Sequence, residues 1–310
     1  ILSSLFLYFS LSTAYNFPMK QIGLRAHDLG TFDSAEQLAS AIAVYGPSIP
    51  IQLAIRKVLR NAPQPSAYTE TFIRTLHDEL AAKGAYVGVF GCYINPVHPD
   101  KAIRDQQLTS FEQHLKFANL LGCPLVGTET GSLNADCSFH PDTAEPKVLD
   151  VLYRSIDRLV EAAAKYDAIV GVEAVSKQHT ISSIDRMAAL AEKFDTPHLK
   201  IIYDPVNLIP WTGLTEKDGS SRGKPSLEAQ RSFVNAALDA FGSRIAALHV
   251  KDFRLDANGY KIGDLPFGEG VFDWKDLFSE LRKRSIEVPA LLENANPATL
   301  ADTLSILSTY

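Results

Sequence analysis

The sequence predicts an α/β fold in which the whole chain forms one (β/α)8 TIM barrel domain. Eight short apolar segments recur along the chain, and longer segments with helical periodicity separate them. No linker rich in Gly, Ser or Pro divides the 310 residues. A barrel of this kind takes about 250 residues as one domain. A doubly wound parallel sheet is the alternative fold for the same alternation.

The expected strands are short runs of β-branched and other apolar residues. In chain order they occupy residues 21–28, 51–55, 86–91, 124–129, 168–174, 199–204, 245–250 and 289–293. Amphipathic helices should fill the intervals between them. The segment 148–166 shows the pattern, because apolar residues recur there at steps of three and four: Leu149, Leu152, Ile156, Leu159 and Ala163.

Composition narrows the classes of function. The chain has 30 Lys and Arg against 36 Asp and Glu, and its net charge of -6 argues against a broad basic face for nucleic acid. The three cysteines lack CxxC spacing, which is typical of reduced thiols in a cytoplasmic protein. We therefore expect a cytoplasmic protein without nucleic-acid or membrane partners.

Residues 1–18 carry no charge and are mostly apolar. They are too short for a membrane span and lack the basic start of a signal peptide, whereas the first Met is Met19. We expect the native chain to begin near Met19, with 1–18 as an N-terminal extension outside the native fold and 19–310 as the barrel domain. Two alternatives remain for residues 1–18. They could be a truncated signal peptide, or a hydrophobic arm packed on the barrel or on a partner subunit.

Polar residues end the last four predicted barrel strands. Glu173, Asp204, His249 and Glu293 follow apolar runs at 168–174, 199–204, 245–250 and 289–293. A single carboxylate there would ordinarily be a solvated or capping residue. Four metal-competent side chains on consecutive strands predict a site for one divalent cation, with Mn, Mg, Co and Zn all compatible. In such barrels the active site lies at the carboxyl ends of the strands.

These residues lie in motifs that resemble the xylose isomerase-like TIM barrel superfamily of sugar phosphate isomerases and epimerases. The motifs are VEAV around Glu173, YDPVN around Asp204, HVKDF around His249, FGEGVFDW at 267–274 and LLEN around Glu293. The resemblance covers about residues 20–307. It implies that Glu173, Asp204, His249 and Glu293 hold one cation and that Glu173 and Glu293 are the catalytic acid/base pair.

The implied function is a metal-dependent isomerase or epimerase of carbohydrate metabolism, acting on a small-molecule sugar or sugar phosphate. Removing a proton next to a carbonyl creates an enediolate, which a chelated cation would stabilise. Two carboxylates on opposite faces would epimerise, and one carboxylate serving both carbons would isomerise. A dehydratase of a keto-polyol, resembling inosose dehydratase, and a non-catalytic sugar- or metal-binding barrel remain alternatives. The resemblance also makes a homo-oligomer an expectation.

Three residues depart from the ketose 3-epimerases of that superfamily. Asn207 replaces a His, Lys177 replaces a carboxylate, and Arg254 stands one residue before the expected Arg. These departures predict a different substrate preference, with Lys177, Lys251 and Arg254 available to hold a phosphate or carboxylate of the substrate. The superfamily's endonuclease IV needs further His ligands that are missing here, which again disfavours nucleic acid.

Further residues at the predicted rim are candidates for substrate contact. They are His27, Asn95, His98, Glu129 and His179, together with Asn207. The alternative for each is a structural role, as a hydrogen-bonded rim residue or a turn residue.

Overall fold

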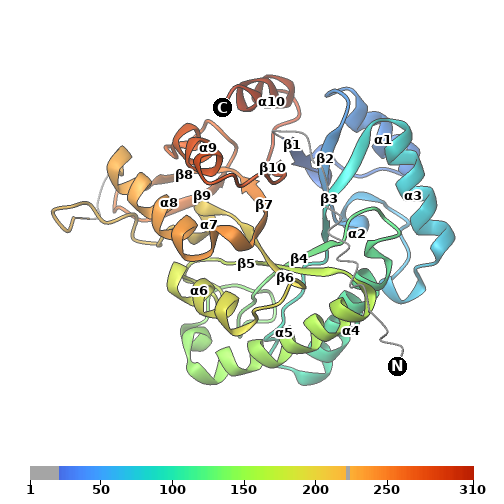
Figure 1. Cartoon of the computed structure of the whole chain (residues 1–310), viewed down its shortest axis with the longest axis horizontal. Helices are drawn as coiled ribbons and strands as arrows, with labels where there is room; N and C mark the ends of the chain where they lie inside the picture. Colours follow the sequence, from blue (N-terminus) through green and yellow to red (C-terminus); the bar gives the residue numbers. More distant parts are fainter. Residues whose placement is uncertain (1–20, 221–223) are drawn as a thin grey trace, which may run out of the picture.

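The computed structural model describes residues 21–220 and 224–310, so the expectation for residues 1–18 lies outside the described residues. Its strands form a closed barrel in the order β1-β10-β7-β6-β5-β4-β3-β2, which confirms the predicted TIM barrel (Figure 1). The barrel strands are β1 (Ile22–Arg25), β2 (Ile49–Leu53), β3 (Ala85–Gly91), β4 (Leu125–Glu129), β5 (Ile169–Glu173), β6 (Leu199–Tyr203), β7 (Ile245–Val250) and β10 (Ala290–Leu292).

Each barrel strand pairs in parallel with its neighbours, so all carboxyl ends meet at one edge. Side chains fill the barrel interior. A Cβ on Gly127 would lie 2.7 Å from Cδ1 of Ile202 and 2.8 Å from Cγ1 of Val89, and a Cβ on Gly171 would lie 3.1 Å from the same Ile202 atom. Glycine at 127 and 171 therefore makes room for Ile202 in the core.

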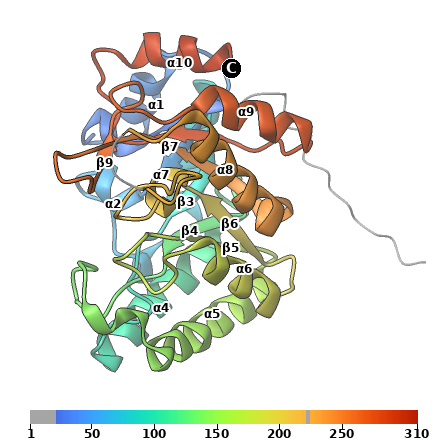
Figure 2. The ribbon, with the colours of Figure 1, turned by 90° about the vertical axis from the view of Figure 1, so that its left-hand side faces the viewer.

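Helices surround the barrel (Figures 1 and 2). In both views α4 (Lys101–Ala118), α5 (Pro146–Tyr166) and α6 (Ile184–Lys193) cover one side, and α1 (Ala35–Ala43) and α10 (Leu300–Ser308) lie on the opposite side. The rest of the ring comprises α3 (Glu70–Ala82), α8 (Leu227–Phe241) and α9 (Trp274–Lys283). Short turns connect these elements: η1 (Ala26–Leu29), α2 (Ile55–Val58), η2 (Pro65–Ala67), η3 (Pro141–Ala144), α7 (Pro205–Leu208) and η4 (Gly242–Arg244).

The amphipathic pattern of α5 is confirmed. Leu152, Ile156, Leu159 and Ala163 are fully buried against the barrel. Leu149 also packs against the core but stays partly exposed. The apolar stripe thus fixes which face of the helix covers the strands.

Two local features differ from the sequence prediction. The first strand ends at Arg25, because η1 turns the chain where the extended run was expected to continue to residue 28. An unexpected antiparallel hairpin, β8 (Asp252–Leu255) and β9 (Lys261–Leu265), follows β7. Its turn is closed by Asp256, whose Oδ1 accepts from the backbone N–H groups of Asn258 and Tyr260. Within the described residues, no helix is both long and apolar enough to cross a membrane.

Candidate metal and substrate site

The four predicted metal ligands meet at the carboxyl edge of the barrel. Glu173 is the last residue of β5, Asp204 follows β6, His249 is next to last in β7, and Glu293 follows β10. All four side chains are buried, with at most 5% of any residue exposed. The parallel register explains the convergence, because each residue occupies the same end of its strand.

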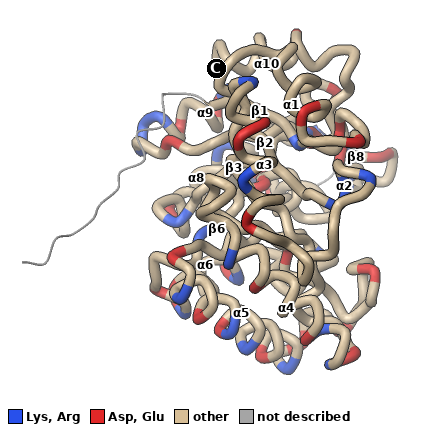
Figure 3. Tube along the Cα trace, turned by 90° about the vertical axis from the view of Figure 1, so that its right-hand side faces the viewer, with Lys and Arg blue, Asp and Glu red and all other residues tan. Residues whose placement is uncertain are grey.

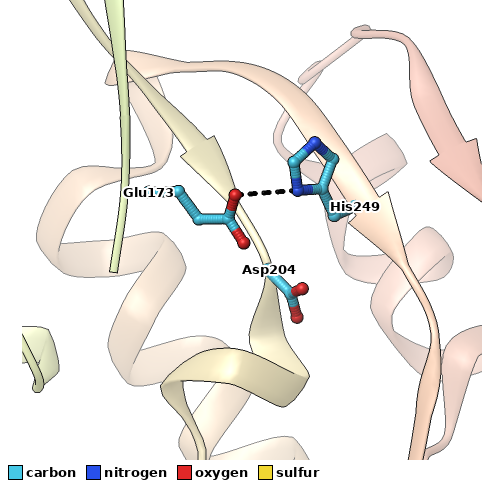
Figure 4. Close-up of side chains that lie close together, drawn as sticks. All are labelled: Glu173, Asp204 and His249. Atoms are coloured by element: carbon cyan, nitrogen blue, oxygen red, sulfur yellow. Dashed lines mark ion pairs between the residues drawn. The ribbon is translucent and has the colours of Figure 1, made fainter. Parts of the chain in front are cut away.

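Three of the four come close enough to share an ion. Ligand atoms of Glu173, Asp204 and His249 all lie within 4.8 Å of one another (Figure 4). His249 Nδ1 lies 3.0 Å from Oε2 of Glu173 and 3.5 Å from Oε1 of Glu293. The imidazole therefore lies between the two glutamates, with Asp204 beside them.

The chemistry of this group fits a divalent cation. Nε2 of His249 is buried and has no hydrogen-bond partner among the described residues, whereas His249 Nδ1 contacts Glu173 and Asp204 Oδ2 contacts Lys251. Buried polar atoms without partners are costly, and a bound ion would satisfy them. Carboxylate oxygens with one imidazole suit Mn²⁺, Co²⁺, Zn²⁺ and, through the oxygens, Mg²⁺.

Asn207 positions one of the glutamates. The Oδ1 atom of Asp204 accepts from the backbone N–H of Asn207 at 2.8 Å and caps α7. The Asn207 side chain then donates from Nδ2 to Oε1 of Glu173 at 2.6 Å. Asn207 therefore supplies a hydrogen-bond donor to Glu173 at the position where the resemblance implied a His.

Lys251 is a buried cation inside the acidic group. Its Nζ lies 3.0 Å from Oδ2 of Asp204, 3.1 Å from Oε2 of Glu293 and 2.8 Å from Oδ1 of Asp264. Burial opposes its charge, but Asp204, Glu293 and Asp264 outweigh burial and hold the Lys251 pKa well above its usual value. Lys251 therefore stays an ammonium and neutralises part of the carboxylate charge.

The two glutamates at the site have different surroundings. Burial would raise the pKa of Glu293, but His249, Lys251 and Arg25 outweigh burial and hold it well below its usual range. The guanidinium of Arg25 lies 3.3 Å from Oε1 of Glu293 and donates to Asn294 Oδ1 at 2.5 Å. Glu293 is therefore held as a carboxylate by three cationic groups.

Neighbouring groups titrate away from their ordinary ranges. Burial opposes the charge of His249, yet Glu173 and Glu293 raise its pKa to about 9. Burial raises the pKa of Asp204 to about 6, and burial together with Glu173 raises that of Glu129 to about 8. A metal ligand imidazole must be neutral, so loading a cation would release the His249 proton.

A polar cavity of about 450 Å³ opens above these residues. Six residues predicted from the sequence line it: His27, Glu129, His179, Asn207, Lys251 and Glu293. Sequence reasoning did not single out the other lining residues: Arg25, Gln52, Lys57, Tyr93, Asp136, Cys137, Val175, Gln178, Asp264 and Asn294. For Arg25 there was a signal, because it precedes His27 by two residues and follows the same apolar run.

Four predicted substrate residues lie outside the cavity lining. Asn95 donates from Nδ2 to the carbonyls of Ser132 and Asn134 at 2.8 and 3.0 Å, which joins two loops. His98 is buried and its Nδ1 accepts from the backbone N–H of Asp100 at 3.1 Å.

The other two are the predicted phosphate-binding cations Lys177 and Arg254. The Lys177 ammonium lies 4.3 Å from the ring centre of Trp211 and 4.9 Å from that of Phe139. Arg254 is exposed on β8. Neither cation is among the residues that line the cavity.

Comparison with known proteins places these observations in a family. The family model of xylose isomerase-like TIM barrels matches residues 51–309. No curated protein sequence matches the chain significantly.

Solved structures share the fold at low identity. The 3-keto-D-glucoside 4-epimerase from E. coli is 16% identical, with a TM-score of 0.68 over 94% of this chain and 99% of that one. A xylose isomerase-like barrel protein from Mycobacterium smegmatis, solved with magnesium, is 15% identical, with a TM-score of 0.64 over 95% and 97% of the two chains. The probable 3-DHS dehydratase of petrobactin synthesis from Bacillus anthracis is 16% identical, with a TM-score of 0.65 over 94% and 99%. With a family model matching most of its length, the chain belongs to the xylose isomerase-like TIM barrel family.

Proposed function

We propose that this protein is a divalent-metal-dependent isomerase or epimerase of a small sugar or sugar phosphate, with Glu173 and Glu293 as the catalytic acid/base pair. One observation carries the proposal. Two buried glutamates lie 3.0 and 3.5 Å from one imidazole nitrogen, beneath a polar cavity at the carboxyl end of the barrel. The epimerases among the structural neighbours are consistent with it.

Glu173, Asp204, His249 and Glu293 would hold the cation. When bound, it would act as a Lewis acid that stabilises negative charge developing on the oxygens of the substrate. Asn207 fixes the orientation of Glu173 through a single hydrogen bond. Lys251 and Arg25 fix Glu293 from two sides.

The two carboxylates support the proposed reaction class. A carboxylate base removes a proton from the carbon next to the carbonyl of the substrate, and a carboxylic acid returns a proton to the resulting enediolate. If Glu173 and Glu293 face opposite sides of the substrate, the proton leaves one face and returns to the other, which inverts one carbon. If one glutamate serves both carbons, aldose and ketose interconvert. Lys251 and the imidazoles of His27 and His179 line the cavity as partners for the hydroxyl groups of the substrate.

Proton exchange with solvent tests this proposal. The metal-loaded protein is incubated in D2O with a panel of ketoses and ketose phosphates, and NMR follows deuterium entering the carbon next to the carbonyl. We expect incorporation by the native protein and its loss in Glu173→Gln and Glu293→Gln. Glu280→Gln is the matched control, because Glu280 is 7% exposed but lies on α9 with Lys283 and Arg284 as its partners. Undiminished exchange in both site variants would refute the assignment.

A dehydratase is the second candidate, favoured by the structural likeness to a probable dehydratase. It would use the same proton abstraction and then expel a hydroxyl group as water. If mass spectrometry of the same incubation finds a product that is lighter than the substrate by one water, the protein is a dehydratase and not an epimerase. Binding of sugar without exchange or loss of water would indicate a non-catalytic barrel.

A further inference from the structure

A second cavity of about 390 Å³ lies beside the first, between α2, η2, the end of β3 and α4. Its floor is neutral, formed by buried residues such as Tyr68, Cys92 and His114. Arg56 and Lys57 of α2 line the cavity and are exposed. The tube is blue beside the α2 label in Figure 3. No Asp or Glu is among its described lining residues.

The floor contains a hydrogen-bond donor without a partner. Tyr68 is only 7% exposed, and its hydroxyl has no hydrogen-bond partner among the described residues. Burial raises the pKa of Tyr68 far above the neutral range, so the hydroxyl keeps its proton. Gln107, which is half-buried, also lines this cavity, and its Oε1 accepts from the backbone N–H of Asn95 at 2.7 Å. The buried Tyr68 hydroxyl therefore calls for an acceptor.

The two cavities differ in charge. Glu129, Asp136, Asp264 and Glu293 all line the first cavity, whereas the second has only cationic charge at its described lining. Two cations of the first cavity are already paired, since Arg25 contacts Asp28 and Glu293 and Lys251 contacts three carboxylates. The second cavity therefore presents two cationic side chains that no carboxylate of its described lining neutralises, which favours an anionic group there.

Lys57 connects the two spaces. Lys57 and Tyr93 line both cavities, and the Lys57 ammonium lies 5.0 Å from the ring centre of Tyr93. The described residues offer Lys57 no carboxylate within ion-pair distance, and the same holds for Arg56. The two cavities therefore share two lining side chains, and a ligand that reaches into both would pass Lys57 and Tyr93.

We propose that the second cavity binds a phosphate monoester carried by the substrate, while the reacting carbons lie in the first cavity. The inference rests on the proposed function and specifies its substrate class as a sugar phosphate. Arg56 and Lys57 supply two charges, and Tyr68 with the rim amides supplies neutral donors for the remaining phosphate oxygens. This pair of cations takes the role that the sequence suggested for Lys177, Lys251 and Arg254.

The first arm of the test measures binding of inorganic phosphate by calorimetry. We expect Arg56→Met to weaken binding about tenfold, and Tyr68→Phe, which removes only a hydroxyl, to weaken it severalfold. Arg74→Met is the control for net charge, because Arg74 lies on α3, is 61% exposed and does not line the cavity. Phosphate affinity that is equal in the native protein and both cavity variants would overturn the proposal.

The second arm compares a ketose with its terminal phosphate, by binding and by kcat/KM. We expect the native protein to prefer the phosphate ester and Arg56→Met to lose about tenfold of that preference, mainly through a higher KM for the ester. Phosphate binding through Arg56 without any preference for the ester would identify a free-anion site and overturn the substrate assignment. A protein that binds the ester preferentially but turns over neither sugar would contradict the proposed function and support the phosphate site.

Discussion

Replacing Lys251 with Met should destabilise the protein strongly. The ammonium lies within 3.1 Å of oxygens on Asp204 and Glu293, two residues that are 2% and 5% exposed. Removing one partner of a buried ion pair leaves the opposite charge uncompensated, which costs about 3 to 5 kcal/mol. Asp264 adds little to this figure, because its side chain is 70% exposed.

Urea unfolding of native protein and Lys251→Met, each with EDTA and with saturating Mn²⁺, measures the loss. A cation held by the same carboxylates would replace part of the missing positive charge, so Mn²⁺ should stabilise Lys251→Met more than the native protein. Lys275→Met controls for the substitution, because Lys275 is an exposed residue of α9. A loss below about 1 kcal/mol in EDTA would refute the view that Lys251 compensates buried charge.

Three further predictions concern orientation, packing and pH. Asn207→Ala should lower kcat at least about tenfold in steady-state assays, because it removes the hydrogen bond that the Asn207 amide donates to Glu173. Gly127→Ala should cost about 1 to 3 kcal/mol in urea unfolding, because its Cβ would lie 2.7 Å from Ile202. Burial lowers the pKa of His114 to about 4, so between pH 6.5 and 4 the unfolded chain binds a proton that the folded protein does not, and stability falls as pH falls. Unfolding measured across that range should show a smaller acid loss in His114→Gln, by at most about 3 kcal/mol.

The barrel and the convergence of the predicted metal ligands could be predicted because both follow from the alternation of strands and helices along the sequence. Alternating strands and helices determine parallel pairing, and parallel pairing brings the ends of consecutive strands together. Glu173, Asp204 and His249 therefore converge as the sequence indicated. The site residues themselves stay a prediction until they are tested by substitution.

The sequence predicts the geometry of the loops less well than that of the barrel. The hairpin β8–β9 was missed because KIGDL in β9 has a mixed polar pattern that does not stand out as a strand. Asn95 and His98 follow a strand as expected, yet their side chains turn toward neighbouring loop backbone, a choice that spacing does not determine. The contact of Arg25 depends on Glu293, which lies far along the chain, and the contact of Asp264 with Lys251 depends on the β8–β9 hairpin, which carries Asp264 on β9.

Elemental analysis of the purified, unchelated protein tests the central claim most directly. We predict about one Mn, Co, Mg or Zn per chain, lost in His249→Ala and in Glu173→Ala and retained in Glu280→Gln. Three zinc ions per chain would indicate a different kind of centre. No metal, even after reconstitution with each of the four ions, would contradict the metal site formed by Glu173, Asp204, His249 and Glu293.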